Sequence, residues 1–297
     1  MRIYRLENST MPYAWGSPDG LSRALAIPNP TGKPLAELWM GAHSKAPSSI
    51  LVPGGKRALD EFIRSDPEGS IGLDSLQRFG PRLPFLFKAL SAAKPLSIQV
   101  HPAKRKAEHG FEKESESGIP VDAYNRNYRD SNHKPELSIA LSGFEALCGF
   151  RPLDSIIDNM RLLVPDMHKR YFGRLERNPG KIELSVFFYA LMTIAPEARL
   201  AMIQHSAEAI SGLLESGGAP AAEEKAWRWV LELAKAWPGD IGAIAPLIFN
   251  YVEFKPGEAV FISPGEPHAY LGGTALEIMA NSDNVLRGAL TDKHIDI

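Results

Sequence analysis

Two histidines, one glutamate and one glutamine in three separated segments offer side chains that a metal ion can use. The segment LSIQVHPAK carries Gln99 and His101, PELSIALS carries Glu136, and PGEPHAYLGG carries His268. Imidazole nitrogens, carboxylate oxygens and amide oxygens are all competent ligands for a borderline divalent cation such as zinc. A lone histidine usually packs or faces solvent, so the combination, rather than any one residue, predicts a metal site.

Strand alternation places these candidates on particular faces. Side chains at alternate positions of a strand point to the same side. Ser97, Gln99 and His101 therefore share one face of their strand, opposite an apolar face. Glu136 shares its face with small residues, which leave room for a cavity. A turn rich in Gly and Pro then delivers His268 at the start of another strand.

No thiolate contributes to this set, because the only cysteine is Cys148 in the apolar segment FEALCGF. We expect Cys148 to be a small buried hydrophobe rather than a reactive thiol. A ligand set of nitrogen and oxygen atoms more often serves a catalytic ion that keeps one position for water or substrate. A single cysteine also fits a reducing cytoplasm.

The chain divides into three blocks with different patterns of apolar residues, and these blocks position the candidate ligands. Short apolar or alternating runs between Pro and Gly predict strands over 1–151, apolar residues three and four apart predict helices over 152–250, and strand texture returns over 251–297. Segregated runs of this kind indicate one mainly β catalytic domain in two parts, interrupted by an all-helical insertion.

Composition narrows the class of partner. The net charge is −2, which gives no reason to expect nucleic acid or an anionic membrane surface. No apolar run approaches the roughly 20 residues that span a bilayer, and the N-terminus lacks the apolar core of a signal peptide. We expect a cytoplasmic protein, a monomer, whose partner is a small molecule.

Four segments in order, KPLSIQVHPAK, NHKPELSIAL, PGEPHAYLGG and NSDNVLRGALTDKHID, resemble the signatures of the type I mannose-6-phosphate isomerase family, the phosphomannose isomerases. ELWMGAH and MPYAWGS also resemble their family counterparts, so the resemblance covers nearly the whole chain. It implies a cupin-type jelly-roll barrel with a helical insertion. Long family members continue beyond KHID into a second β domain, which we expect to be absent here, leaving an exposed sheet edge or apolar patch.

The resemblance also implies roles for individual residues. It makes Gln99, His101, Glu136 and His268 the ligands of one zinc ion per chain. Arg287 matches the catalytic arginine of the family, and Lys134 matches a lysine in the substrate pocket. The first cupin motif is altered to Gln-x-His, with Glu136 displaced along the chain, as is typical of this family.

The implied reaction interconverts D-mannose 6-phosphate and D-fructose 6-phosphate, moving a proton between C2 and C1 through a cis-enediol. Zinc would stabilise the developing negative charge. Lys134 and Glu277 are both candidates for the base, and Lys134 could instead neutralise phosphate. Arg287 could bind phosphate or a sugar oxygen, or pair with Glu277, and Ser97 could donate to phosphate.

Two rival functions come from other classes. A non-catalytic cupin module would bind a sugar phosphate without proton-transfer groups, and the presence of both Lys134 and Arg287 speaks against it. A cupin oxygenase with a redox metal generally uses a set richer in histidine, and Gln99 speaks against that. The product could serve carbohydrate metabolism or GDP-mannose biosynthesis, and the sequence does not choose between them.

Overall fold

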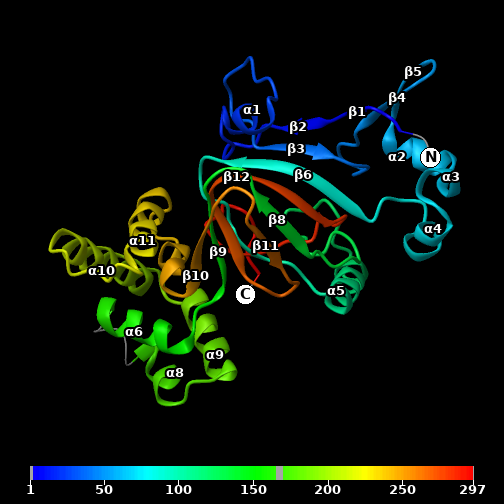
Figure 1. Cartoon of the computed structure of the whole chain (residues 1–297). Coiled ribbons are helices and arrows are strands. Elements are labelled where there is room, and N and C mark those ends of the chain that lie inside the picture. Colours follow the sequence, from blue (N-terminus) through cyan, green and yellow to red (C-terminus); the bar gives the residue numbers. More distant parts are fainter. Residues whose placement is uncertain (1–2, 165–169, 297) are drawn as a thin grey trace.

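A computed structural model describes residues 3–164 and 170–296 of the chain. The fold combines antiparallel sheets with helices (Figure 1). The strands are β1 (Leu6–Glu7), β2 (Ser9–Met11), β3 (Glu37–Met40), β4 (Ser49–Val52), β5 (Gly55–Ala58), β6 (Phe85–Ala92), β7 (Ile98–Val100), β8 (Glu136–Ala140), β9 (Phe144–Phe150), β10 (Phe249–Phe254), β11 (Ala259–Ile262), β12 (His268–Ala280) and β13 (Leu286–Ala289). The helices are α1 (Gly20–Leu25), α2 (Leu59–Ser65), α3 (Pro67–Ile71), α4 (Leu73–Phe79), α5 (Lys104–Glu116), α6 (Leu153–Leu163), α8 (Gly173–Arg177), α9 (Lys181–Met192), α10 (Pro196–Glu215), α11 (Glu224–Ala236) and the 3-10 helix Ile241–Leu247.

The long strand β12 joins two antiparallel layers. Its first part pairs with β7 and β9, and those strands extend to β13 and β10. Its second part pairs with β6 and β8, and those strands extend to β3, β2 and β11. Ring and aliphatic side chains that include Phe144 and Tyr270 fill the space between the layers. The strand β12 is therefore part of both layers, and it brings their inner faces together.

A bulge in β12 changes which side chains face inward. The register against β9 shifts between Tyr270 and Gly272, which inserts one extra residue. His268 and Tyr270 lie on the inner face before the bulge, and Glu277 lies on the inner face after it, where it accepts a hydrogen bond from the Tyr270 hydroxyl. In a regular strand His268 and Glu277 would point to opposite faces, because their sequence positions differ by an odd number.

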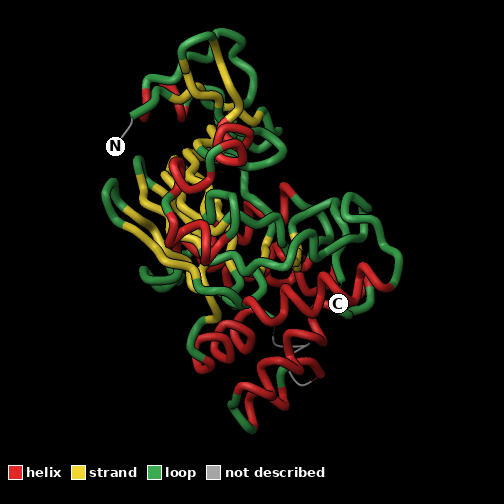
Figure 2. Tube along the Cα trace, turned by 90° about the vertical axis from the view of Figure 1, so that its right-hand side faces the viewer, coloured by secondary structure: helices red, strands yellow, loops and turns green. Residues whose placement is uncertain are grey.

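Helices between β9 and β10 pack on the outside of the first layer (Figures 1 and 2). Their core is continuous with that layer, because buried side chains of α6, α10 and α11 form one cluster with Ile98, Leu147, Ala269 and Leu271. The expected helices of this block include residues 165–169, which lie outside the described residues. No single described helix is long and apolar enough to cross a membrane, and α9 with α10 meets that length only as a pair bent by 106°.

The outer face of the second layer carries an apolar row. Cross-strand pairing aligns one residue from each of five neighbouring strands, namely Phe261, Leu137, Ile278, Phe87 and Met40. Helix α1 covers the Met40 end through Leu21, whereas Phe261 is 62% exposed and Ile278 is 40% exposed. The expected exposed apolar patch therefore exists on this face.

The one cysteine is in β9 and packs beside the inner core. Burial, and then the charge of Glu266, raises the pKa of Cys148 to about 12. The thiol is therefore protonated near neutral pH, consistent with the expected inert residue.

We predict that Gly273→Ala destabilises the protein, because the bulge needs glycine at this position. The φ angle of Gly273 is +106°, and a Cβ there would lie 2.2 Å from the carbonyl oxygen of Gly143. The free energy of unfolding should fall by about 1–3 kcal/mol, measured by urea denaturation. Gly143→Ala is the control, since nothing lies within 4 Å of its added Cβ; equal stability of the two variants would contradict the role of the bulge.

Candidate metal and substrate site

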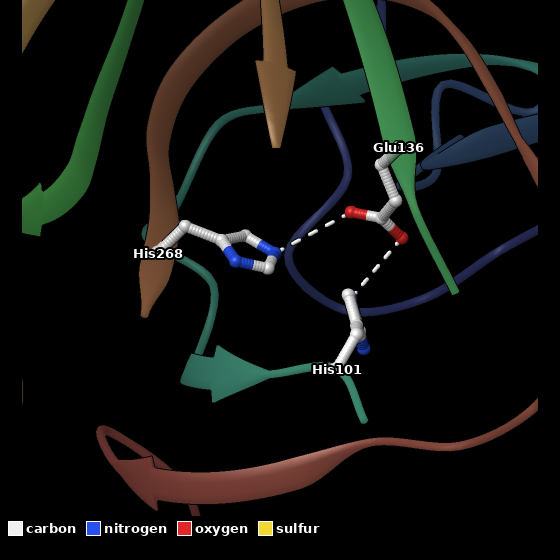
Figure 3. A group of neighbouring side chains, drawn as sticks. All are labelled: His101, Glu136 and His268. Atoms are coloured by element: carbon white, nitrogen blue, oxygen red, sulfur yellow. Dashed lines mark ion pairs between the residues drawn. The ribbon is translucent and has the colours of Figure 1, made fainter. Parts of the chain in front are cut away.

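Three of the four candidate ligands converge between the layers (Figure 3). His101 follows β7, Glu136 begins β8 and His268 begins β12, and all three are buried. The Nε2 atom of His101 lies 3.2 Å from Oε1 of Glu136, and Nε2 of His268 lies 3.4 Å from Oε2. One possible ligand atom from each residue falls within 4.8 Å of the others. The two rings and the carboxylate thus face a common point.

Backbone carbonyls set the tautomer of both imidazoles. Nδ1 of His101 lies 2.9 Å from the carbonyl oxygen of Asn284, and Nδ1 of His268 lies 3.0 Å from that of Glu266. A carbonyl oxygen can only accept, so each Nδ1 carries the proton and donates it. In the neutral ring the lone pair is then on Nε2, the atom that faces Glu136. Metal-bound histidines are oriented by the same kind of contact.

The charges around His101 keep its ring neutral. Burial, and then the positive charge of Lys134, lowers the pKa of His101 to about 4. Burial alone would raise the pKa of Glu136, but the positive charge of Lys134, whose Nζ lies 3.0 Å from Oε1, holds it well below its usual range. The site therefore presents a carboxylate and at least one unprotonated imidazole near neutral pH.

This donor set fits a divalent cation. Oε2 of Glu136 is buried and has no hydrogen-bond donor among the described residues. Its neighbour is Nε2 of His268, 3.4 Å away, the ring atom that is able to bind a metal. A cation between them would satisfy both atoms, and nitrogen with oxygen ligands suits zinc.

Gln99 lies against this group as the strand alternation predicted. Its side-chain nitrogen is 3.3 Å from Nε2 of His268. The amide oxygen is the atom able to bind a metal, and turning the amide by half a revolution exchanges the two atoms. Ser97 is partly buried on the same strand segment, without a side-chain hydrogen bond among the described residues. Gln99 is thus placed to complete the ligand set, and Ser97 borders it.

Lys134 also reaches the metal-binding group. Its Nζ atom lies 3.0 Å from Oε1 of Glu136 and 3.5 Å from Nε2 of His101, and the residue is buried. The extended backbone through Pro135 keeps Lys134 and Glu136 on one side. Lys134 is therefore adjacent to the ligands, where sequence reasoning placed it.

A second group of buried charged residues lies further along the inner face. Glu277 accepts from the Tyr270 hydroxyl at 3.1 Å, and its Oε2 lies 3.2 Å from Nζ of Lys88, which also lies 3.6 Å from Glu37. Burial, and then the charge of Glu136, raises the pKa of Glu277. Burial alone would lower the pKa of Lys88, but Glu37 and Glu277 raise it well above its usual value.

Sequence reasoning missed Lys88, although a signal existed. The segment LPFLFKAL has one charge in an otherwise apolar strand, and that charge falls on the inward face. A buried lysine in such a strand needs a carboxylate partner. Glu277, suggested as a partner of Arg287, instead pairs with Lys88.

Arg287 is in β13, where its backbone pairs with that of Gln99. The guanidinium is partly buried, and burial followed by the nearby charge of Arg129 lowers its pKa. It makes no ion pair within the described ranges. Arg287 is therefore next to the metal-binding group and free to meet an anion.

His43 is buried at the edge of the site. Its Nε2 lies 3.5 Å from Oδ1 of Asp283, and Lys45 Nζ lies 2.8 Å from the other oxygen. These three residues line a cavity of about 500 Å³ together with Arg129 and Asp130. The cavity opens beside the loop that supplies the carbonyl to His101.

The family profile described as phosphomannose isomerase type I, catalytic domain, matches residues 3–153. The mannose-6-phosphate isomerase of Salmonella typhimurium is 43% identical over 299 residues, covering 99% of this chain and 73% of the relative. The mannose-6-phosphate isomerase 1 of Arabidopsis thaliana is 37% identical over 316 residues, covering 100% of this chain and 69% of the relative. Human mannose-6-phosphate isomerase is 34% identical over 314 residues, covering 100% and 71%.

Solved structures agree with the sequence relatives. A crystal structure of the Salmonella typhimurium enzyme bound to its substrate, fructose 6-phosphate, and zinc superposes with a TM-score of 0.87 at 41% identity, covering 99% of this chain and 72% of that chain. A zinc-bound mannose 6-phosphate isomerase structure gives the same TM-score, identity and coverage. Family profile, relatives and fold agree, and the chain belongs to the type I phosphomannose isomerase family.

Proposed function

We propose that the chain is a zinc-dependent aldose-ketose isomerase that interconverts D-mannose 6-phosphate and D-fructose 6-phosphate. The observation that carries this proposal is the buried convergence of His101, Glu136 and His268 beside Lys134 and Gln99. The relatives bear the same enzyme name, and one is solved with zinc and fructose 6-phosphate. A module that only bound sugar would not need buried ionisable groups against the metal ligands.

The residues that would hold zinc are Gln99, His101, Glu136 and His268. When bound there, the ion would act as a Lewis acid that stabilises negative charge on the sugar oxygens. Only Glu136 would bring a formal negative charge, because an imidazole binds a metal in its neutral form and an amide carries no charge. The ligand set therefore leaves a net positive site facing the reacting end of the substrate.

A base must remove the proton from C2 of the aldose and return it to C1, with the reverse order for the ketose. Lys134 and Glu277 remain the candidates, and we favour Lys134. Its amino group lies directly against the ligands, whereas Glu277 lies further along the inner face, beside Lys88 and Tyr270. Glu277 would then hold a sugar hydroxyl or set the charge of the pocket, and Arg287 would bind an oxygen of the substrate.

Several finer features belong to the same proposal. The two antiparallel layers joined by β12 would be a cupin-type jelly roll, with catalytic parts over 1–151 and 251–297 and the helical insertion over 152–250. We further propose a cytoplasmic monomer that uses neither nucleic acid nor a membrane.

Removing one imidazole should remove the metal and the activity together. We expect His101→Ala or His268→Ala to lose most bound zinc, measured by elemental analysis, and most activity in a coupled isomerase assay. The matched control is His205→Ala, because His205 is exposed on α10 and bonds only to the Ala201 carbonyl. A chelated wild-type protein with full activity would disprove the proposed chemistry.

The metal-free protein should show an unusually acidic histidine. Because burial and Lys134 favour the neutral ring, His101 should stay unprotonated as the pH falls from 7 and should titrate near pH 4 rather than near 6.5. Ring chemical shifts followed by NMR against pH test this, with His101→Gln assigning the signal. A transition near pH 6.5 for that signal would contradict the buried, cation-flanked environment.

Loss of the proposed base should reduce turnover more than substrate binding. We expect Lys134→Gln to lower kcat by about 10²–10⁴ fold, the usual contribution of a positioned general base. Zinc content is measured in parallel, and Lys94→Gln serves as the control, because Lys94 is exposed just before β7. If Glu277→Gln shows the larger loss and Lys134→Gln a small one, Glu277 is the base.

A further inference from the structure

Asn284 is fully buried in the loop between β12 and β13, and it engages both ends of its side-chain amide. Its Oδ1 accepts hydrogen bonds from the backbone N–H groups of Arg129, at 2.7 Å, and of Asp130, at 3.2 Å. Its Nδ2 donates to the carbonyl oxygens of Asp130, at 2.7 Å, and of Asn132, at 2.9 Å. One side chain therefore fastens the loop before β8 to the loop before β13.

Two more side chains strengthen this connection. The hydroxyl of Ser282 donates to Oδ1 of Asp130 at 2.9 Å and accepts from the backbone N–H of Asn284. The carboxylate of Asp130 also accepts from the backbone N–H groups of Asn132 and Asp283, both at 2.8 Å. We call Asp130, Ser282 and Asn284 the loop clamp. It joins the two loops through side chains that come from both of them.

The two loops support different members of the metal-binding group. Asn132 precedes Lys134 by two residues and Glu136, at the start of β8, by four. From the other loop, the carbonyl oxygen of Asn284 lies 2.9 Å from Nδ1 of His101 and accepts its proton. Nζ of Lys134 in turn lies 3.5 Å from Nε2 of His101. A shift of either loop would therefore move the histidine relative to Lys134 and Glu136.

Asparagine is the residue type that satisfies all of these backbone groups together. An amide presents an acceptor oxygen and two N–H donors on one planar group. In Asn284 the oxygen faces two N–H groups and the nitrogen faces two carbonyl oxygens. An aspartate of the same shape would turn an acceptor toward those carbonyl oxygens, and an alanine would leave all four backbone groups without this partner. The amide of Asn284 thus sets the spacing of the two loops.

We infer that the loop clamp is a positioning device for the metal-binding group and the proposed base, with Asn284 as its central residue. Asn284 acts through His101 and Lys134 rather than by binding the ion itself. The inference rests on the proposed function for the roles of zinc and Lys134, whereas the direction that it gives to the His101 ring does not depend on that function. The segment NSDNVLRGALTDKHID thereby gains a role beyond that of Arg287.

Asn284→Ala tests the loop clamp without altering a ligand. The affinity for zinc, measured by competition with a chelator, should fall about ten- to a hundredfold, as is common when the group behind a metal-binding histidine is disturbed. In the zinc-saturated enzyme kcat for fructose 6-phosphate should also fall about ten- to a hundredfold, because a reacting group is misplaced, and KM should change by less.

Asn159→Ala is the matched control. Asn159 is a buried asparagine in α6 whose amide donates to the carbonyl oxygen of Leu247, far from the metal ligands along the chain. Its replacement also leaves a buried carbonyl oxygen without this partner, so it should lower the stability of the protein. Zinc affinity and kcat should nevertheless stay at the wild-type values.

A spectroscopic signature separates positioning from a general loss of stability. In the metal-free wild-type protein near neutral pH, the ring nitrogen chemical shifts of His101 should report one tautomer, with the proton on Nδ1, because the Asn284 carbonyl holds that proton. Asn284→Ala should add the tautomer with the proton on Nε2, since this carbonyl is no longer fixed in place. Asn159→Ala should keep the single tautomer.

A folded Asn284→Ala protein with wild-type zinc affinity, kcat and His101 tautomer overturns the loop clamp and leaves the proposed function standing. Equal losses in Asn159→Ala overturn it as well. If Asn284→Ala does not fold, Asp130→Asn decides, because it keeps the shape of the clamp but removes a charged acceptor; it should show the same losses to a smaller extent, and wild-type values in it overturn the clamp. A wild-type protein without isomerase activity contradicts the proposed function, while weaker zinc binding and mixed tautomers in Asn284→Ala still support the clamp.

Discussion

The convergence of one buried carboxylate and two buried imidazole rings on a common point is the constraint on which the site depends. Glu136 lies between His101 and His268, and one of its oxygens has no hydrogen-bond donor within residues 3–164 and 170–296. Burying such a group costs several kcal/mol unless an opposite charge is present. The carbonyls of Asn284 and Glu266 enforce this arrangement, because they hold the ring protons on the far side. The fold thus maintains a position that only a cation completes.

Two groups of charged residues surround that position, and they differ in how their charges are paired. On the inner side, Lys88 pairs with both Glu37 and Glu277, so two carboxyl groups share one ammonium group there. On the outer side, Arg287 makes no ion pair among the residues that the structure describes, and the charge of Arg129 lies near it. A site with carboxyl groups deep inside and cations at its mouth favours an anionic ligand that enters one way round. Polarity of this kind suits a substrate with a charged end and a reacting end.

Strand alternation and residue chemistry were enough to predict the short strands of the site. Gln99 and His101 do share a face, and Lys134 does reach Glu136. Alternation could not place His268 with Glu277, since the extra residue in β12 reverses the pattern between them. A bulge is a local backbone choice stabilised by contacts with β9, and those contacts are long-range in sequence.

Other parts of the site depend on contacts that no local pattern encodes. Asn284 matters through its backbone carbonyl and through an amide that ties two loops together. Neither contact can be predicted from the residue types nearby. The pairing of Lys88 with Glu277 likewise depends on the register of β6 against β12. The helical block was recognisable from its periodicity, but its packing into the core of the first layer depends on where Leu147 and Ala269 point.

The bulge in β12 makes insertions and deletions there unlike those elsewhere on the molecule. Losing one residue between Tyr270 and Gly273 would restore strict alternation and turn the following stretch over, so that Glu277 would point outward and Ile278 inward. Such a change would exchange the side chains that line this half of the cavity with those that face outward. The amino-acid composition of the strand would hardly change. The number of residues in this stretch of β12 therefore matters to the site as much as the identity of any metal ligand does.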